Sequence, residues 1–370
     1  MEGRRRFILK GAALVAAGAA ASLDAPMIHA QSRFQWRMST AWLPNLDLLL
    51  ASAQRFARIV DEMSSGRLKI QVHAGGEIMA TGACFDACSQ GTIEVFFGSS
   101  HYWTAKDPGF LWFSKVPFGL NGQGMMSWLL HGDGLKLWEE GYAPFHLIPR
   151  PGPSTGMQMA GWFRKKLGSP SAFKDLKMRI QGIGGKILGV LGTTVVLTPG
   201  NEIIAALERG VIDAAEWVGP HDDIRLGLPA VARYYYYPSW HEPGSTTELT
   251  FNRKAYEALP SELRYIVEYA CQSVQVTGLA EYEQRNALAL GRLRADFKGK
   301  VDILALSSSI LKELRRVSEQ VLRDESEKST VGRKAYASMG KFQAQINDWR
   351  LISEAAYQTS IAPHSTSPGA

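Results

Sequence analysis

Stretches that predict β-strands alternate with stretches that predict helices along the first part of the chain. Residues Leu68–Val72 (LKIQV) alternate strictly between apolar and polar side chains, which predicts a half-buried strand. We also expect strands at Phe34–Met38 and Ile93–Phe97, and a helix from Asp47 to about Met63. Strand–helix–strand units with short glycine-bearing connections favour an α/β fold, in which helices cover both faces of a sheet. The apolar face of the predicted helix consists of Leu49, Phe56, Ile59, Val60 and Met63.

A second block with the same alternation follows, and long helices come after it. In this block we expect strands at Gln158–Trp162, Lys177–Gln181, Thr194–Leu197 and Val211–Trp217, and a helix at Asn201–Arg209. From residue 260 onward the pattern predicts helices at about Ser261–Phe297, Ser309–Asp324 and Lys334–Tyr357. The end of the chain from Thr359 is rich in Ser, Thr and Pro and is expected to fray. These patterns predict two α/β lobes followed by a helical tail.

The first 30 residues have the features of an export signal. Arg4–Arg6 and Lys10 precede the small and apolar run Gly11–Ser22, and Ile28–Ala30 fits a cleavage site. The apolar run is too short to span a bilayer, which takes about 20 residues. Paired arginines followed by phenylalanine resemble a twin-arginine signal, so we expect a periplasmic protein whose mature form begins near Gln31. A basic amphipathic anchor helix is the alternative.

Charge and cysteine content argue against two classes of protein. The formal net charge is +6, and the first 30 residues carry four positive and two negative charges, which leaves +4 on the rest. Without a basic stripe and interleaved aromatic residues, that charge does not favour a nucleic-acid partner. The three cysteines, Cys84, Cys88 and Cys271, are an odd number and lack the spacing of a disulfide framework, so we expect buried thiols.

The sequence contains no complete catalytic or nucleotide-binding motif, but two clusters leave alternatives open. His221–Asp223 offers metal ligands. Because it follows Gly219-Pro220, however, the start of a helix is favoured, where acidic side chains complement the helix dipole. Tyr234–Tyr237 forms either a ligand cage or, as we favour, a strand with two side chains in the core and two outside.

Three charged residues lie next to segments that we expect to be buried. Arg179 falls inside a predicted strand, Glu216 at the end of another, and Glu242 in a Pro-Gly loop. A buried charge without a partner is costly, so each needs one. One interpretation is a structural pair between Arg179 and either glutamate. In the other, Arg179 binds a ligand carboxylate through two parallel hydrogen bonds, and the glutamates hold a hard cation through their oxygens.

Several motifs resemble those of the periplasmic solute receptors of tripartite ATP-independent periplasmic (TRAP) transporters. The two longest are Asp175–Gly182 (DLKMRIQG) and Glu202–Glu216 (EIIAALERGVIDAAE), and both resemble signature segments of this family. The segment Trp240–Gly244 (WHEPG) and the pair Glu216-Trp217 look closest to the branch that binds 2-oxo acids or lactate with a cation. Further matches, in the family's order, are Ser65–Val72, Val116–Phe118 and Leu259–Arg264.

The resemblance implies an α/β, two-lobed periplasmic binding protein fold with hinge strands and a long C-terminal helical tail. Two such lobes close over a ligand in the cleft between them. The implied parts are an export signal (1–30), a discontinuous lobe I (31–154 and 252–330), lobe II (155–251), and a C-terminal dimerisation helix with its tail (331–370).

The resemblance also implies a receptor rather than an enzyme. Its ligand would be a small 2-oxo monocarboxylate such as pyruvate, or lactate, which it would deliver to the membrane permease subunits of a TRAP transporter. An exported enzyme that acts on small organic acids is the alternative, although no general base paired with a nucleophile is recognisable. A sensory or scaffold protein with the same fold is a third interpretation.

Each of six residues has an implied role in binding. Arg179 would neutralise the ligand carboxylate, and Tyr102 would donate a hydrogen bond from the other lobe. The bound cation would be sodium, with calcium as the alternative. The substrate-binding residues are then Arg179, Gln158, Tyr102 and Trp217, and the cation ligands are Glu216, Glu242, Gln158 and the carbonyl of Trp217.

The last predicted helix resembles the C-terminal helix that related receptors exchange between protomers. Its apolar residues recur at steps of three and four, which gives it one apolar face. A single chain could not readily bury this projecting face, so we expect a homodimer. The residues concerned are Phe342, Ile346, Trp349, Ile352 and Ala356.

Overall fold

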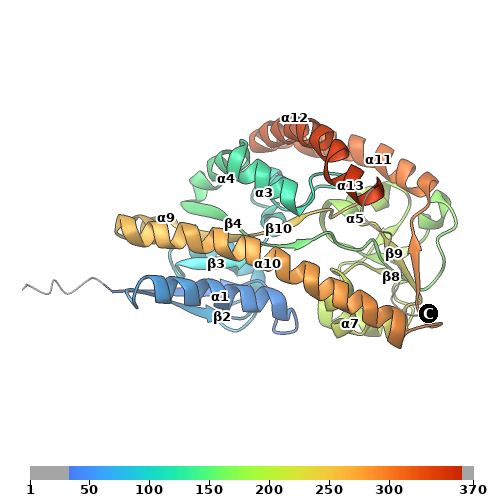
Figure 1. The fold of residues 1–370 in the computed structure, drawn as a ribbon, viewed down its shortest axis with the longest axis horizontal. Coiled ribbons are helices and arrows are strands. Elements are labelled where there is room, and N and C mark those ends of the chain that lie inside the picture. The colour runs from blue at the N-terminus through green and yellow to red at the C-terminus, as the bar shows by residue number, and fades with distance from the viewer. Residues whose placement is uncertain (1–32, 361–370) are drawn as a thin grey trace, which may run out of the picture. The chain divides into compact units, whose positions relative to one another are not determined.

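Two β-sheets, with helices packed against them, form the framework of the protein (Figure 1). The computed structural model describes residues 33–360. The predicted export signal and the end of the tail beyond residue 360 lie outside the described residues. None of the helices in the described part combines the length and hydrophobicity needed to cross a membrane.

The first sheet has five strands in the order β2-β1-β3-β10-β4. Strands β1, β2 and β3 are parallel, and β10 runs antiparallel to both β3 and β4. The predictions of the first three strands are confirmed, whereas β4 and β10 were not predicted. The strands are β1 (Phe34–Thr40), β2 (Leu68–His73), β3 (Val95–Gly98), β4 (Leu147–Gly156) and β10 (Ser245–Asn252).

Strand β4 was missed because it contains three prolines, Pro149, Pro151 and Pro153. Proline has no backbone N–H, so it argues against a strand in the middle of a sheet. Here β4 is an edge strand, and every second residue of an edge strand directs its N–H away from the sheet. The fold therefore tolerates a proline at alternate positions.

The second sheet has six strands in the order β11-β9-β5-β8-β6-β7. Several are shorter than predicted: only Ala214–Ala215 of the expected Val211–Trp217 and Thr194–Val195 of the expected Thr194–Leu197 pair with neighbours. The expected strand from Gln158 begins only at Gly161, so Gln158 lies in the connection from β4. The strands are β5 (Gly161–Phe163), β6 (Lys177–Arg179), β7 (Thr194–Val195), β8 (Ala214–Ala215), β9 (Tyr234–Tyr237) and β11 (Asp302–Ala305).

The four tyrosines of β9 form a strand, as favoured from the sequence. The prediction that buried and exposed side chains alternate along it is wrong. The two buried members, Tyr235 and Tyr236, are adjacent rather than alternate. Adjacent side chains point to opposite faces of a sheet. Tyr235 packs in one hydrophobic cluster and Tyr236 in another, which shows that both faces of this sheet are covered.

A single long helix, α10 (Ser261–Asp296), packs against β4 of the first sheet and against the helices α1 (Asp47–Met63) and α7 (Pro220–Leu226) (Figure 1). The predictions of α1 and α10 are confirmed. Met63 was expected on the buried face of α1, but it is 53% exposed because it lies in the last turn. The remaining helices before α11 are α2 (Cys84–Ser89), α3 (Gly122–His131), α4 (Gly134–Tyr142), α5 (Gly182–Val190), α6 (Ile203–Glu208), α8 (Leu228–Val231) and α9 (Arg253–Glu257).

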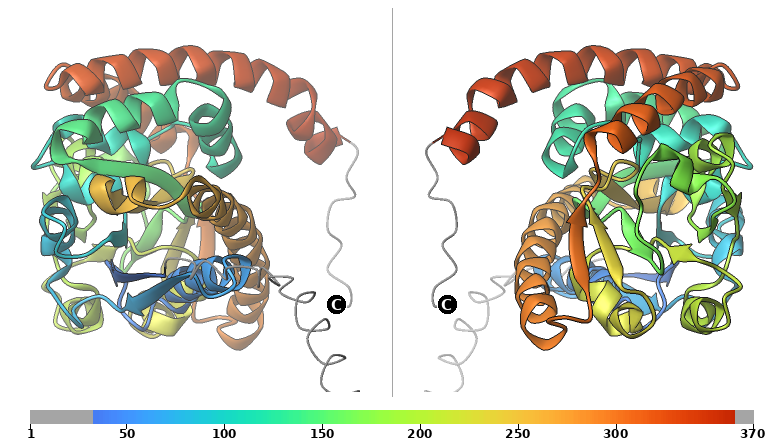
Figure 2. Two further views of the ribbon diagram at one scale, coloured as in Figure 1. Left: turned by 90° about the vertical axis from the view of Figure 1, so that its left-hand side faces the viewer. Right: turned by 90° about the vertical axis from the view of Figure 1, so that its right-hand side faces the viewer.

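Three helices end the described chain: α11 (Ser308–Ser326), α12 (Thr330–Ile352) and α13 (Glu354–Ser360). The single helix expected at Lys334–Tyr357 is therefore interrupted at Ser353. Helix α12 lies across α3, α4 and α11, as the side views show (Figure 2). The three cysteines are buried free thiols, as predicted.

Candidate ligand-binding site

A cavity of about 150 Å³ lies where residues from both sheets meet. This volume has room for several water molecules or for one small ligand. Its walls include the segment that follows β1 and residues that follow the strands β6 and β8. All six predicted site residues line it: Tyr102, Gln158, Arg179, Glu216, Trp217 and Glu242.

Arg179 and Glu216 are neighbours because β6 and β8 are adjacent parallel strands. Arg179 is the last residue of β6 and stands beside Ala215, and Glu216 directly follows β8. Arg179 Nη1 donates hydrogen bonds to the backbone carbonyl of Glu216 (2.5 Å) and to its Oε2 atom (3.0 Å). The structural pair that the sequence left open is therefore formed.

This pair leaves one edge of the guanidinium free. Within residues 33–360, no hydrogen bond forms from Nε or Nη2 of Arg179, and Nε is buried. The side chain of Arg179 is 4% exposed, and its guanidinium carbon lies 5.1 Å from the centre of the Trp217 ring. The Nε–Nη2 edge of a guanidinium has the geometry to bind both oxygens of a carboxylate.

Glu216 is charged at neutral pH although it is 2% exposed. Burial acts to raise the pKa of this carboxyl, but His241, Arg179 and Lys115 lower the pKa by more, so that it lies below its usual value. His241 Nε2 is 3.8 Å from Glu216 Oε1, a distance too long for a hydrogen bond. The site therefore keeps a buried negative charge.

Lys115 was not recognised from the sequence, and it forms an ion pair with Glu242. The side chains of Lys115 and Glu242 are only 9% and 3% exposed. A signal was present: Lys115 is the single charged residue in the largely apolar and aromatic stretch Pro108–Leu120. Because a buried lysine needs a partner, an isolated lysine in such a stretch indicates a charged partner from elsewhere in the fold.

Gln158 and Tyr102 occupy different parts of the cavity wall. Gln158 is 5% exposed, and its Nε2 donates to Thr155 Oγ1 (3.1 Å). Its Oε1 is buried and finds no partner among the described residues. Tyr102 lies in a short 3₁₀ helix (Ser100–Trp103) and is 37% exposed. Its ring packs against that of His101, with the two ring centres 4.3 Å apart.

His101 is a second residue of this wall that the sequence did not point out. Burial lowers the pKa of its imidazole, and Lys115 and Arg179 lower the pKa further, so the ring is neutral at neutral pH. Its Nδ1 lies 2.8 Å from Ser99 Oγ. His101 thus adds a polar group to the cavity without adding charge.

The residues of the cavity fit a bound cation. Ligand atoms of Glu216, His241 and Glu242 all lie within 4.8 Å of one another. Carboxylate and amide oxygens are the usual ligands of hard cations, and the unpartnered Oε1 of Gln158 offers such an oxygen. The arrangement can therefore bind a cation through oxygens and an anion through Arg179.

Comparison with known proteins identifies the family. Residues 38–329 match the family described as bacterial extracellular solute-binding protein, family 7. The chain belongs to this family. The monocarboxylate 2-oxoacid-binding periplasmic protein of Nostoc sp. (strain PCC 7120) is 40% identical over 324 residues, which are 88% of this chain and 88% of the relative.

Two solved structures of TRAP transporter solute-binding proteins are similar over nearly their whole length. The protein from Bordetella bronchiseptica RB50 is 34% identical, with a TM-score of 0.84, over 88% of this chain and 96% of its own. It is a dimer of mixed occupancy, with calcium and picolinate in one site and none in the other. The protein from Pseudoalteromonas atlantica T6c, with bound sodium and pyruvate, is 31% identical, with a TM-score of 0.85, over 90% of this chain and 100% of its own.

The family-7 protein described here is therefore a periplasmic solute-binding protein of the TRAP type and not an enzyme. The predicted α/β fold, with two lobes and a long C-terminal helix, is confirmed. The resemblance found in the sequence motifs is likewise confirmed. The roles of the individual site residues stay predictions.

Proposed function

We propose that this receptor binds a small 2-oxo monocarboxylate, such as pyruvate, together with a sodium or calcium ion, and delivers it to the permease of a TRAP transporter. The observation that carries the proposal is the cavity itself. It combines the free edge of Arg179 with two buried glutamates and the unpartnered amide oxygen of Gln158. The names of the Nostoc and Pseudoalteromonas proteins support the same class of ligand.

Charge-assisted hydrogen bonds would supply most of the affinity. A ligand of this size has little apolar area to bury, so it cannot bind tightly through the hydrophobic effect alone. Arg179 would donate hydrogen bonds from Nε and Nη2 to the two oxygens of the carboxylate, while Nη1 continues to donate to Glu216. The ring of Trp217 beneath the guanidinium would keep its plane fixed, and Tyr102 would donate a hydrogen bond from the opposite wall.

The cation would be held by Glu216, Glu242, Gln158 Oε1 and the carbonyl of Trp217. When bound, it supplies a positive charge for a second oxygen of the ligand. Such a contact favours acids that carry an oxygen at position 2, and lactate meets the same requirement. Two anionic ligands with neutral oxygens suit both sodium and calcium.

A panel of ligands with and without each ion tests this function. In chelator-treated protein, we expect pyruvate with sodium or calcium to raise the melting temperature, and acetate, which lacks the oxygen at position 2, to raise it much less. Ligand at 100 times its dissociation constant stabilises the folded state by about 2.7 kcal/mol. Isothermal titration calorimetry then ranks the acids and the ions. Equal binding of acetate and pyruvate would contradict the proposed role of the 2-oxygen.

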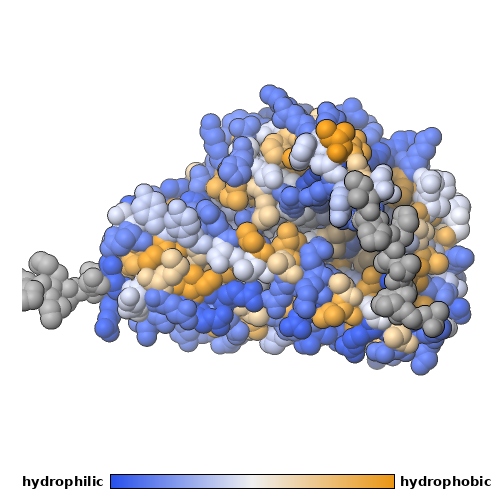
Figure 3. All heavy atoms as spheres, in the orientation of Figure 1, coloured by the Kyte–Doolittle hydropathy of each residue, from blue (hydrophilic) through white to orange (hydrophobic). Residues whose placement is uncertain are grey.

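We also propose that the receptor is a homodimer joined through its C-terminal helices. Phe342 and Ile346 of α12 pack against the chain's own core, whereas Trp349 and Ile352, further along, are 61% and 75% exposed. Hydrophobic side chains are visible over this end of α12 in Figure 3. An apolar surface that continues past its own core is typical of an interface between subunits, and the Bordetella relative is a dimer.

Light scattering tests the dimer. We expect the wild-type protein to have the mass of a dimer at micromolar concentration, and Trp349→Glu to have that of a monomer, because a charge in the centre of an apolar interface is costly. Val276→Glu on α10 is the matched control, since Val276 is exposed to a similar extent, 59%. A wild-type protein with the mass of a monomer would contradict the proposed homodimer.

The export route and the exact lobes belong to the same proposal. We propose export through the twin-arginine route, and lobes divided at residues 154/155 and 251/252. The strands β4 and β10 of the first sheet both end close to these positions, at Gly156 and Asn252.

A further inference from the structure

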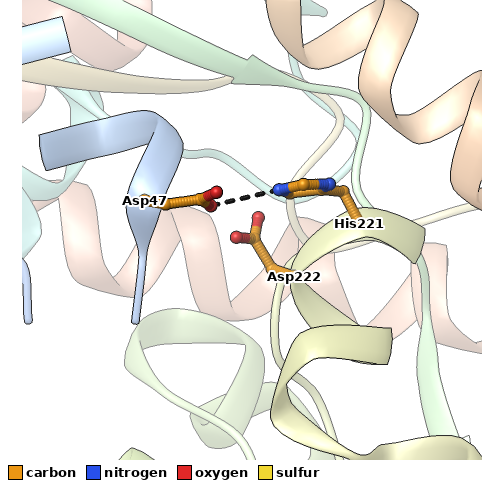
Figure 4. A group of neighbouring side chains, drawn as sticks. All are labelled: Asp47, His221 and Asp222. Carbon is orange, nitrogen blue, oxygen red and sulfur yellow. Dashed lines mark hydrogen bonds and ion pairs between the residues drawn. The ribbon is translucent and has the colours of Figure 1, made fainter. Parts of the chain in front are cut away.

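A second cluster of metal-ligand side chains lies outside the cavity and consists of Asp47, His221 and Asp222 (Figure 4). One ligand atom from each lies within 4.8 Å of those from the other two. Asp47 is the first residue of α1, and His221 and Asp222 lie in the first turn of α7. The cluster therefore joins two helices that are far apart in the sequence.

One distance within the cluster is close to that between two ligands of a small divalent ion. His221 Nε2 and Asp47 Oδ1 form a hydrogen bond of 3.1 Å. In a tetrahedral zinc site with bonds of about 2.0–2.1 Å, neighbouring ligand atoms are about 3.3 Å apart. These two atoms already have nearly the separation that a shared metal ion requires.

Asp222 provides an independent indication of a ligand. It is 2% exposed, and neither of its carboxylate oxygens forms a hydrogen bond of normal geometry among residues 33–360. The nearby buried hydroxyl of Tyr282 likewise has no such partner there. Figure 4 shows its carboxylate directed toward the space beside Asp47 and His221. A buried carboxyl group without a partner is rare, because it loses its contacts with water and gains none in return.

The start of helix α7 does not account for Asp222. Asp223 fulfils the structural role there, since it accepts hydrogen bonds from the backbone N–H of Val218 (3.1 Å), from Trp162 Nε1 (2.8 Å) and from the hydroxyl of Tyr235 (2.6 Å). Asp222 makes none of these contacts. The preference for a helix start is thus confirmed for the segment, while one of its acids stays unexplained.

The charges around the cluster favour an added cation. Two other carboxyl groups lie near that of Asp222, those of Asp47 on α1 and of Asp223. Arg225 faces the cluster, but its Nε lies 3.4 Å from Asp47 Oδ1 and its side chain is 46% exposed. A divalent ion would supply the positive charge that Asp222 lacks.

We propose that Asp47, His221 and Asp222 bind a divalent transition-metal ion such as zinc, at a site that joins α1 to α7. One imidazole and two carboxylates form the kind of ligand set that zinc accepts, with water in the fourth position. Sodium and calcium prefer oxygen ligands alone, which separates this site chemically from the cation site of the cavity.

The position of the site gives it a structural role. Helix α1 packs on strand β2 of the first sheet, and α7 follows strand β8 of the second. Leu46 and Leu49 beside Asp47, and Trp217 and Val218 just before α7, line the ligand cavity. A metal ion at this site would cross-link α1 and α7, and so hold two walls of that cavity at a fixed distance.

Zinc titration of tag-free, chelator-treated protein tests the proposal, with calcium and pyruvate present to fill the cavity. We expect one zinc ion per chain, and a loss of affinity of more than about 100-fold in Asp222→Asn and in His221→Gln, because removing even an outer partner of a metal ligand costs 10–100-fold. His131→Gln, which replaces an exposed histidine on α3, is the matched control and retains full affinity.

Two further measurements distinguish this site from the cavity. Cobalt in place of zinc should give the intense visible absorption of a tetrahedral ion in the wild type and not in Asp222→Asn, and a crystal grown with zinc should show its anomalous peak between the three side chains. Glu242→Gln, which alters the cavity, should leave zinc binding unchanged. The proposal would be overturned if the wild type bound zinc no more tightly than Asp222→Asn and His221→Gln do. An anomalous zinc peak away from the three side chains would also overturn it. Both results are independent of what the cavity binds.

Discussion

Replacing Arg179 with lysine is expected to weaken pyruvate binding at least about 30-fold and to leave the fold intact. Loss of one partner from a buried charge-assisted pair costs about 2–5 kcal/mol, and each 1.4 kcal/mol is a factor of ten in affinity. Lysine retains the positive charge that Glu216 requires, but its ammonium group lacks the planar edge that binds both oxygens of a carboxylate. Calorimetry with saturating calcium measures the change.

The control for this variant is Arg150→Lys. Arg150 is also a poorly exposed arginine in ion pairs, with Glu139 and Glu268, but it does not line the cavity. Its replacement removes a half-buried guanidinium without touching the ligand. Circular dichroism and thermal melting check that both variants fold. Binding by Arg179→Lys within about threefold of the wild type would show that Arg179 serves only as the partner of Glu216.

Replacing Lys115 with methionine is expected to make the stability of the protein depend strongly on calcium. Lys115 pairs with Glu242 inside the site, so its removal leaves a buried carboxylate without a counter-charge. Breaking such a pair costs about 3–5 kcal/mol. In the presence of a chelator, we therefore expect the free energy of unfolding to fall by about that amount.

Calcium should restore much of this loss, because an ion at Glu242 would replace the charge of the ammonium group. The increase in melting temperature on adding calcium should then be larger in Lys115→Met than in the wild type, where the ammonium and the ion compete for Glu242. Lys106→Met is the control, since Lys106 pairs with Asp86 on the surface, and exposed pairs contribute only about 0–1 kcal/mol. An equal calcium response in Lys115→Met and the wild type would mean that no cation binds at Glu242.

The two outcomes together separate the halves of the proposed site. A loss of binding in Arg179→Lys concerns the carboxylate of the ligand, whereas the calcium response of Lys115→Met concerns the cation and can be measured without any ligand. If one of the two predictions fails, the other still tests its own half of the site.

Local pattern was sufficient for much of the fold. Strict alternation in Leu68–Val72 and helical periodicity in Asp47–Met63 each predict one element, because the side chains that must be buried recur with the period of that element. Strand β4 could not be predicted in this way. Whether its prolines are tolerated depends on its place at the edge of the sheet, and the order of strands is a tertiary property.

The residue types of the candidate site were also visible in the sequence. A charged residue inside an apolar stretch must find a partner, and this reasoning selected Arg179, Glu216 and Glu242. It could not choose which of the two glutamates pairs with Arg179, since that depends on β6 lying next to β8. Nor could it supply Lys115 as the partner of Glu242, because these residues are 127 positions apart.

By itself, the sequence determined the family, through the resemblance of its motifs. It also determined the alternation of strands and helices, which follows from local periodicity, and the presence of buried charges that require partners, which follows from the cost of burying a charge. Only the tertiary structure decided which charges meet, which edge of Arg179 stays free and that Asp47 reaches His221 across the chain. Such pairings depend on the order and register of elements that are distant in sequence, and no local pattern encodes them.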